Sequence, residues 1–122
     1  MILADTSIWI DHLRSDDPHM SDLLGSGQIA IHPFIVAELA LGMLGNRARV
    51  LTLLDLLPAV RVAKLSEIRE FIESRFLYGK GIGLIDTHLI ASAYLTPPVK
   101  LWTRDKRLRS LASTLRLHAD LD

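Results

Sequence analysis

The strongest constraint on the fold of this chain comes from short apolar runs that alternate with helix-like segments. The runs begin at Ile2, Ile29, Val60 and Val99, and a fifth candidate begins at Leu115. The segments between them carry apolar residues at helical spacing and are bounded by capping residues, Gly or Pro. Short strands that alternate with helices are typical of a mostly parallel sheet. The sequence therefore predicts an α/β fold around a short central sheet of four to five strands.

Length and composition narrow the class of protein. The 122 residues suffice for a single domain, residues 1–122, and a hydrophobic content of 49% provides a sizeable core. Fourteen basic residues balance fourteen acidic ones, so any nucleic-acid binding depends on local charge. With no cysteine, disulfides and thiolate metal sites are excluded. The N-terminus lacks a basic signal region, and the apolar stretch 29–45 is too short for a membrane span. We therefore expect a cytoplasmic protein without a membrane partner.

Four acidic residues lie in otherwise apolar surroundings. Asp5 ends the first predicted strand, Asp105 follows the fourth, Glu38 lies within FIVAELALG, and Asp86 lies within GLIDTHLIA. Each Asp taken alone is also explained as a helix N-cap. Glu38 is not, because it lies inside a predicted helix, where an unpaired buried carboxylate costs on the order of several kcal/mol. Its environment therefore requires either a buried Arg or a cation.

Taken together, the four acids predict a metal site. Asp5 and Asp105 follow strands, so they lie at the carboxyl edge of the sheet, where α/β proteins bind their ligands. Carboxylates that converge there repel one another and raise one another's pKa values, and a divalent cation removes this repulsion. Oxygen ligands without Cys favour Mg²⁺, with Mn²⁺ as a possible substitute, over Zn²⁺. Such a site is suited to phosphoryl chemistry.

Four segments also occur in an order and at a spacing typical of one protein family. They are ADTSIWIDHL, HPFIVAELALG, YGKGIGLIDTHLIASA and LWTRDKRL. Over essentially the whole chain the sequence resembles the PIN-domain nucleases, and within them the VapC-type toxins of bacterial toxin–antitoxin systems. The resemblance implies a PIN-like three-layer α/β/α fold and a Mg²⁺-dependent endoribonuclease. It also implies an RNA substrate, a cognate antitoxin protein and a homodimer.

The resemblance assigns roles to residues by position. It gives the acids the hydrolysis of RNA phosphodiester bonds, with the three Asp residues as metal ligands and the Glu as a ligand or as the group that orients the attacking water. The catalytic acids are then Asp5, Glu38, Asp86 and Asp105. The family also has small polar residues near the first acid and two positions before the last. Ser7, with Thr6 beside it, and Thr103 stand at those places as supporting residues.

The most basic stretch of the chain runs from Lys100 to Arg116, with Asp105 as its single acid. Arg104 and Lys106 flank this acid directly, which predicts that they contact the RNA backbone. The simpler alternative is a solvated helix face. The string GKGIG, residues 79–83, fits neither glycine-rich phosphate-binding pattern and follows a helix, so we interpret it as a flexible helix exit.

Two other classes of function stay open. A phosphatase of the haloacid-dehalogenase type needs a second Asp where this chain has Ser7, and a receiver domain needs paired acids where Asp5 is followed by Thr6. A catalytically silent RNA-binding or regulatory module is the second class, and the presence of all four acids argues against it. The histidines are scattered along the sequence and are not expected to act in catalysis. Trp9 and Trp102 are expected in the core or in a dimer interface.

Overall fold

Three parallel strands form the centre of the protein in the computed structural model, which describes residues 1–122. The strands are β1 (Ile2–Ala4), β2 (Ile29–Ala30) and β3 (Lys100–Trp102), in the order β2-β1-β3. Leu3 of β1 is paired with Ala30 on one side and Leu101 on the other. Because all three strands run in the same direction, their carboxyl ends meet at one edge of the sheet.

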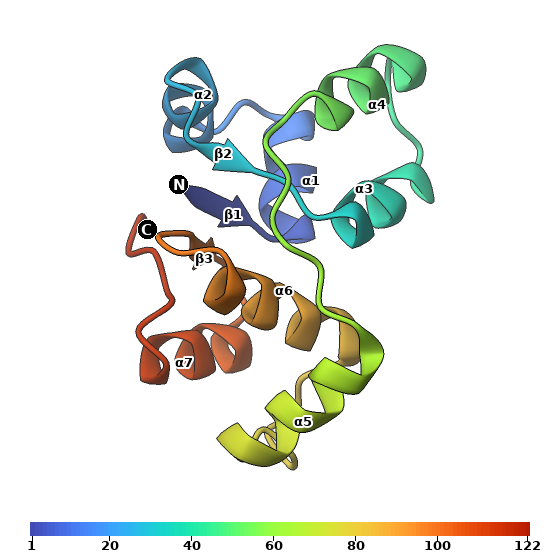
Figure 1. The fold of residues 1–122 in the computed structure, drawn as a ribbon. Helices are drawn as coiled ribbons and strands as arrows, with labels where there is room; N and C mark the ends of the chain where they lie inside the picture. Colours follow the sequence, from blue (N-terminus) through green and yellow to red (C-terminus); the bar gives the residue numbers. More distant parts are fainter.

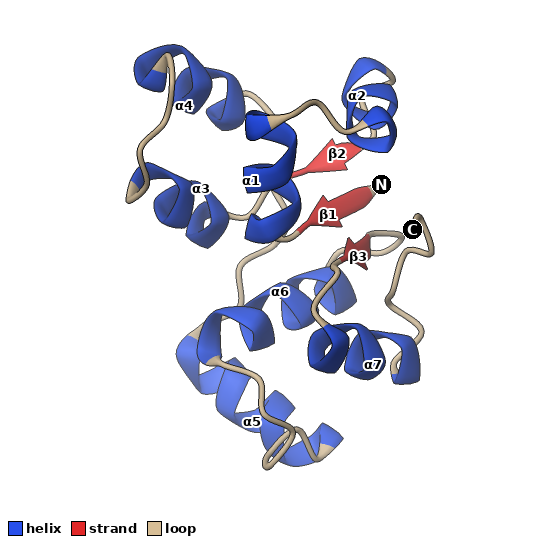
Figure 2. Ribbon diagram, turned by 180° about the vertical axis from the view of Figure 1, so that it is seen from behind, coloured by secondary structure: helices blue, strands red, loops and turns tan.

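Seven helices surround this sheet and confirm the predicted α/β class. Figure 1 shows α1 to α4 gathered on the side of β2 and α5 to α7 on the side of β3, and Figure 2 shows the same division from behind. The helices are α1 (Thr6–Arg14), α2 (Pro18–Gly25), α3 (Pro33–Ala40), α4 (Arg47–Asp55), α5 (Leu65–Arg75), α6 (Leu84–Leu95) and α7 (Lys106–Thr114). None of them is both long enough and apolar enough to cross a membrane.

Helix starts follow directly from the local sequence. The side chains of Asp5, Asp17 and Asp105 accept hydrogen bonds from the free backbone N–H groups at the starts of α1, α2 and α7. Proline at the first helical position, where no hydrogen bond is lost, starts α2 and α3. These caps fix where each helix leaves the sheet, and therefore which residues lie at its carboxyl edge.

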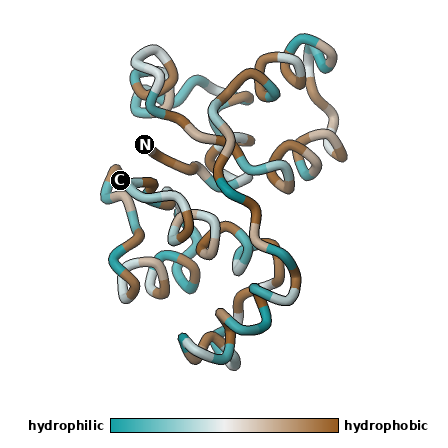
Figure 3. The backbone as a smooth tube through the Cα atoms, in the orientation of Figure 1, coloured by the Kyte–Doolittle hydropathy of each residue, from teal (hydrophilic) through white to brown (hydrophobic).

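The hydrophobic core lies around β1 and β3. Leu3, Leu101 and Trp102 are completely buried, and Trp9 is almost so. The hydropathy colouring of Figure 3 shows the chain of β1 in brown just after the N-terminus. Both tryptophans therefore belong to the core, the first of the two positions expected for them.

The predicted number of strands was too high. The segments from Val60 and from Leu115 each make only one parallel bridge to the sheet, Ile31 with Ala59 and Leu101 with His118. Around the second bridge, the Leu101 N–H donates to the Leu117 carbonyl and the Leu101 carbonyl accepts from the Ala119 N–H. The chain therefore runs beside the sheet at both places, but too briefly to extend it.

Candidate active site

The four acids come from four different elements of the fold. Asp5 directly follows β1, and Asp105 lies three residues after the end of β3. Glu38 lies in α3, and Asp86 lies in the first turn of α6. Residues far apart in the sequence are thus delivered by the ends of the central strands and by two of the helices that pack around them.

Asp5 is the most buried of the four, with 7% of its surface exposed. Its Oδ1 accepts hydrogen bonds from Ser7 Oγ at 2.7 Å and from the Ile8 N–H at 3.2 Å. Its Oδ2 accepts a hydrogen bond from Thr103 Oγ1. The carboxylate is therefore held in one orientation by donors on both oxygens, and the two supporting residues implied by the resemblance are among them.

Thr103 connects the two strand-end acids. Its side chain is completely buried, and besides donating to Asp5 it accepts a hydrogen bond from the Asp105 N–H at 3.1 Å. Asp105 is more exposed, and its Oδ1 accepts from the Leu108 N–H at 2.9 Å as the cap of α7. One hydroxyl thus positions the first and the last acid relative to each other.

Glu38 differs from its expected environment. Its side chain is only partly buried, and it pairs with no Arg. Instead, Oε1 accepts a hydrogen bond from Thr6 Oγ1 at 2.6 Å. Thr6 belongs to α1, so this contact connects α1 to α3, and the second carboxylate oxygen of Glu38 has no protein partner among these hydrogen bonds.

Asp86 carries the clearest electrostatic signature. Its pKa is raised above the ordinary value of an Asp, first by burial and then by the negative charges of Asp105, Asp5 and Glu38, while the Gly83 N–H offsets part of the effect. Gly83, not Asp86, is the N-cap of α6. The capping explanation therefore holds for Asp5 and Asp105, but it does not account for Asp86.

The acids fit a hard divalent cation by their chemistry. All the available donors are oxygens, which is the ligand set of Mg²⁺ and Mn²⁺. No three acidic or histidine side chains lie close enough together to share one ion in the present arrangement. Binding therefore requires at least one carboxylate to turn towards the others, and the repulsion felt by Asp86 is the force that a cation would relieve.

Arg104 lies in a different environment from the one predicted for an RNA contact. Its guanidinium binds the carboxylates of Asp17 at 2.8 Å, Asp122 at 2.9 Å and Asp11 at 3.0 Å. Its pKa is raised by the hydrogen bonds to Asp122 and Asp17. Asp122 also accepts from the Trp102 indole N–H at 3.2 Å. These contacts argue against RNA binding by Arg104, which instead connects the C-terminus to α1 and α2.

Replacing Arg104 by Gln is expected to lower the free energy of unfolding by about 1–2 kcal/mol, because three carboxylates then face one another without a cation. Urea titrations at low and at high salt measure this loss, which should shrink at high salt as the repulsion is screened. Arg69→Gln, at an exposed arginine outside any ion pair, is the control. Equal losses for both variants would contradict a specific network at Arg104.

Two histidines that are far apart in the sequence meet inside the protein. The rings of His32 and His88 lie 6.1 Å apart, and both pack against Phe34. His32 Nδ1 accepts from the Phe34 N–H, while His32 Nε2 and His88 Nδ1 are buried without protein partners. Burial, with the His88 charge as a smaller cause, lowers the pKa of His32 to about 4, so the ring is neutral in the folded protein.

This neutral histidine predicts a loss of stability in acid. The pKa of His32 is 6.5 in the unfolded protein and about 4 in the folded protein. The contribution of neutral His32 to folding stability is therefore complete above pH 6.5 and is lost as the pH falls from 6.5 through 4. The loss is about 3 kcal/mol. His32→Asn keeps an acceptor for the cap and should remove this part of the pH dependence in urea titrations, whereas His19→Asn, at an exposed histidine, should not. Identical curves for His32→Asn and the unchanged protein would contradict this explanation.

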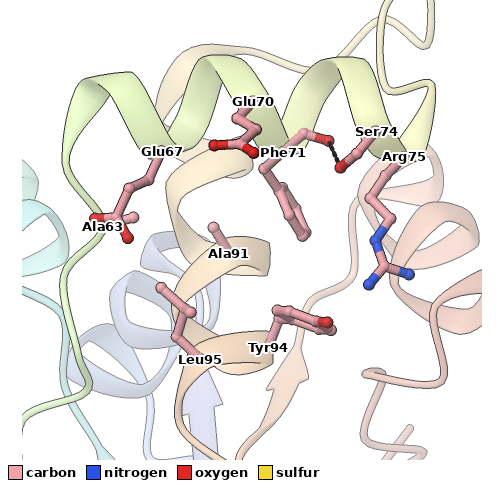
Figure 4. Close-up of a pocket in the computed structure, with 9 residues that line it drawn as sticks. All are labelled: Ala63, Glu67, Glu70, Phe71, Ser74, Arg75, Ala91, Tyr94 and Leu95. Carbon is pink, nitrogen blue, oxygen red and sulfur yellow. Dashed lines mark hydrogen bonds between the residues drawn. The ribbon is translucent and has the colours of Figure 1, made fainter.

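The acids do not line an enclosed cavity. Figure 4 shows a hollow between α5 and α6 that is lined by Phe71, Tyr94 and their neighbours and contains none of the four acids. Glu38 borders another hollow, which lies beside α1, α3 and α4. Three of the four acids are at least partly exposed, and an open edge of this kind suits a long polymer better than a small molecule that must be enclosed.

Comparison with known proteins gives a consistent result. A model of the PIN domain family matches residues 2–113. Over 110 residues the chain is 43% identical to Ribonuclease VapC32 of Mycobacterium tuberculosis, in strains CDC 1551 / Oshkosh and ATCC 25618 / H37Rv alike. The alignment covers 90% of this chain and 89% of the relative.

Proposed function

Because this chain belongs to the PIN-domain family, and to its VapC-type members, we propose that it is a metal-dependent endoribonuclease and the toxin of a toxin–antitoxin pair. The domain would comprise residues 1–122. The observation that carries the proposal is the raised pKa of Asp86, to which three other acids from separate elements contribute. Acids near enough to raise one another's pKa suit a cation-dependent phosphodiesterase, and a purely structural cap does not require them.

In the proposed site the acids bind the metal, and the supporting hydroxyls hold the acids in place. Asp5, Asp86 and Asp105 would hold one or two Mg²⁺ ions, with Mn²⁺ as a substitute. When bound, the metal supplies Lewis-acid chemistry, since it offsets the negative charge of the scissile phosphate and makes water a stronger acid. Ser7 and Thr103 keep the Asp5 carboxylate in a fixed orientation, so little reorganisation is needed when charge develops on the phosphate.

Glu38 is the residue best suited to handle a proton. One of its oxygens is held by Thr6, and the other has no protein donor, so that oxygen can accept a hydrogen bond from an attacking water. Fixing one oxygen restricts the rotation of the carboxylate and directs the other. We therefore assign Glu38 to the orientation of water, with metal binding as the alternative role.

The proposed protein partners are a cognate antitoxin and a second copy of this chain. Exposed apolar side chains at Leu41, Met43 and Leu56 leave surface for such contacts. The cytoplasm, where RNA substrates are found, is the proposed location. The competing function is a catalytically silent RNA-binding or regulatory module with the same fold.

Incubation of the purified protein with cellular RNA tests the proposal against this alternative. Cleavage is expected with Mg²⁺ and is expected to disappear with EDTA or in Asp5→Ala. Bound but intact RNA under all conditions would favour the silent module. Cleavage that survives both EDTA and the substitution would contradict the metal mechanism.

A further inference from the structure

A basic hollow lies between the end of α5, the loop that follows it, and one face of α7. Its volume is about 410 Å³. Four cationic residues line it, and no acidic residue does. The cations are Arg75, Lys80, Lys106 and Arg107. In a chain whose net charge is zero, four cations around one hollow are a marked local concentration.

These cations are not engaged with protein carboxylates. The side-chain ion pairs of the protein involve only Arg104 and His118, so all four cations of the hollow lack an acidic partner. Arg75 lies over the Tyr94 ring at 4.8 Å, as Figure 4 shows from the neighbouring hollow. The contrast with Arg104, which contacts three carboxylates, indicates that this set is available for an anion from outside.

The loop beside the hollow lets an arginine of the hollow approach its backbone closely. Gly81 has a positive φ of 76°, and a Cβ atom at this position would lie 2.8 Å from Arg107 Nη1. The same guanidinium nitrogen is 3.5 Å from the Gly81 carbonyl oxygen. Glycine thus allows Arg107, which lines the hollow, to lie against this loop.

Both walls of the hollow lead to proposed catalytic acids. Lys106 directly follows Asp105 at the start of α7, and the loop that contains Lys80 and Gly81 leads into α6, whose first turn carries Asp86. An extended chain of phosphates that enters the acidic site can therefore continue along this basic surface.

We propose that the hollow lined by Arg75, Lys80, Lys106 and Arg107 binds the phosphate backbone of single-stranded RNA on one side of the scissile bond. This inference rests on the proposed ribonuclease function and adds the path of the substrate. The Ser110 hydroxyl in the same lining offers a further donor to a phosphate oxygen. The contacts are to phosphates, so they provide affinity and direction without reading bases.

The test compares RNA binding by two charge-matched triple variants in an Asp86→Asn background, which keeps the RNA intact. One variant carries Lys80→Gln, Lys106→Gln and Arg107→Gln. The other carries Arg49→Gln, Arg61→Gln and Arg69→Gln, three exposed arginines outside the hollow. Fluorescence anisotropy with a labelled single-stranded RNA of about 20 nucleotides, at several salt concentrations, gives the affinity and its salt slope.

The hollow variant is expected to bind at least about tenfold more weakly, with a salt slope smaller by about 2, because three phosphate contacts are lost. The control variant should bind as tightly as its parent. Equal weakening in both variants would show a net-charge effect and overturn the proposal. Unchanged RNA binding with lost affinity for a polyglutamate peptide would also overturn it, in favour of an acidic protein partner. Because binding is measured without cleavage, the result is separate from the test of catalysis.

Discussion

Asp86→Asn is expected to reduce RNA cleavage by at least about 10³-fold while the protein stays folded. The substitution keeps the size and shape of the side chain but removes the charge that a cation needs. It also removes the carboxylate whose pKa is raised by burial and by Asp105, Asp5 and Glu38, so the free energy of unfolding should rise by on the order of 0.5 kcal/mol after allowance for solvent screening. Cleavage assays and urea titrations on the same preparation measure both effects.

The opposite signs of these two effects make the prediction specific. Substitution of a residue that serves only the structure lowers activity and stability together, whereas Asp86→Asn should lower activity and raise stability. Asp22→Asn, at an exposed carboxylate of α2 that does not act on the pKa of Asp86, removes the same charge outside the proposed site and should change neither quantity. Cleavage by Asp86→Asn at the rate of the unchanged protein would refute the role of this residue.

Thr103→Val is expected to reduce cleavage by about 10- to 100-fold. Valine fills nearly the same volume, but Asp5 Oδ2 loses its donor and the Asp105 N–H loses its acceptor. Asp5 and Asp105, two proposed metal ligands, are then no longer held relative to each other by Thr103. The concentration of Mg²⁺ needed for half-maximal cleavage should rise, which distinguishes a positioning role from a general loss of stability.

Thr103→Ser provides the matched comparison, since it keeps the hydroxyl and should retain most of the activity. Thr52→Val removes an exposed hydroxyl that donates only to the Ala48 carbonyl and should leave cleavage unchanged. If Thr103→Ser were as impaired as Thr103→Val at normal stability, the hydrogen bonds of Thr103 could not be the cause.

Much of the fold follows from local sequence signals. Asp5 and Asp105 were predicted as strand-end residues and as possible caps because each follows an apolar run and precedes a helical pattern, and both features are present. The strands expected at Val60 and Leu115 are only single bridges, because apolar composition favours burial beside a sheet but does not determine how many residues pair with it.

The environment of individual side chains was harder to predict. Thr6 contacts Glu38 from a distant part of the sequence. Arg104 contacts Asp11, Asp17 and Asp122, which lie 18 to 93 positions away from it. No local sequence pattern encodes such contacts. The same holds for the pairing of His32 with His88, which looked unrelated in the sequence. Local sequence patterns predicted the four acids as candidates, whereas the tertiary fold determines which hydroxyls and cations surround them.

The most direct measurement of the central claim is the titration of the protein with Mn²⁺, followed by electron paramagnetic resonance of the free ion. The claim is that acids from separate elements form one cation site. It predicts stoichiometric binding of one or two ions to the unchanged protein, competition by Mg²⁺, and strong weakening in both Asp5→Asn and Asp86→Asn, with Asp22→Asn unaffected. Equal Mn²⁺ binding by all four proteins, or by none of them, would contradict it.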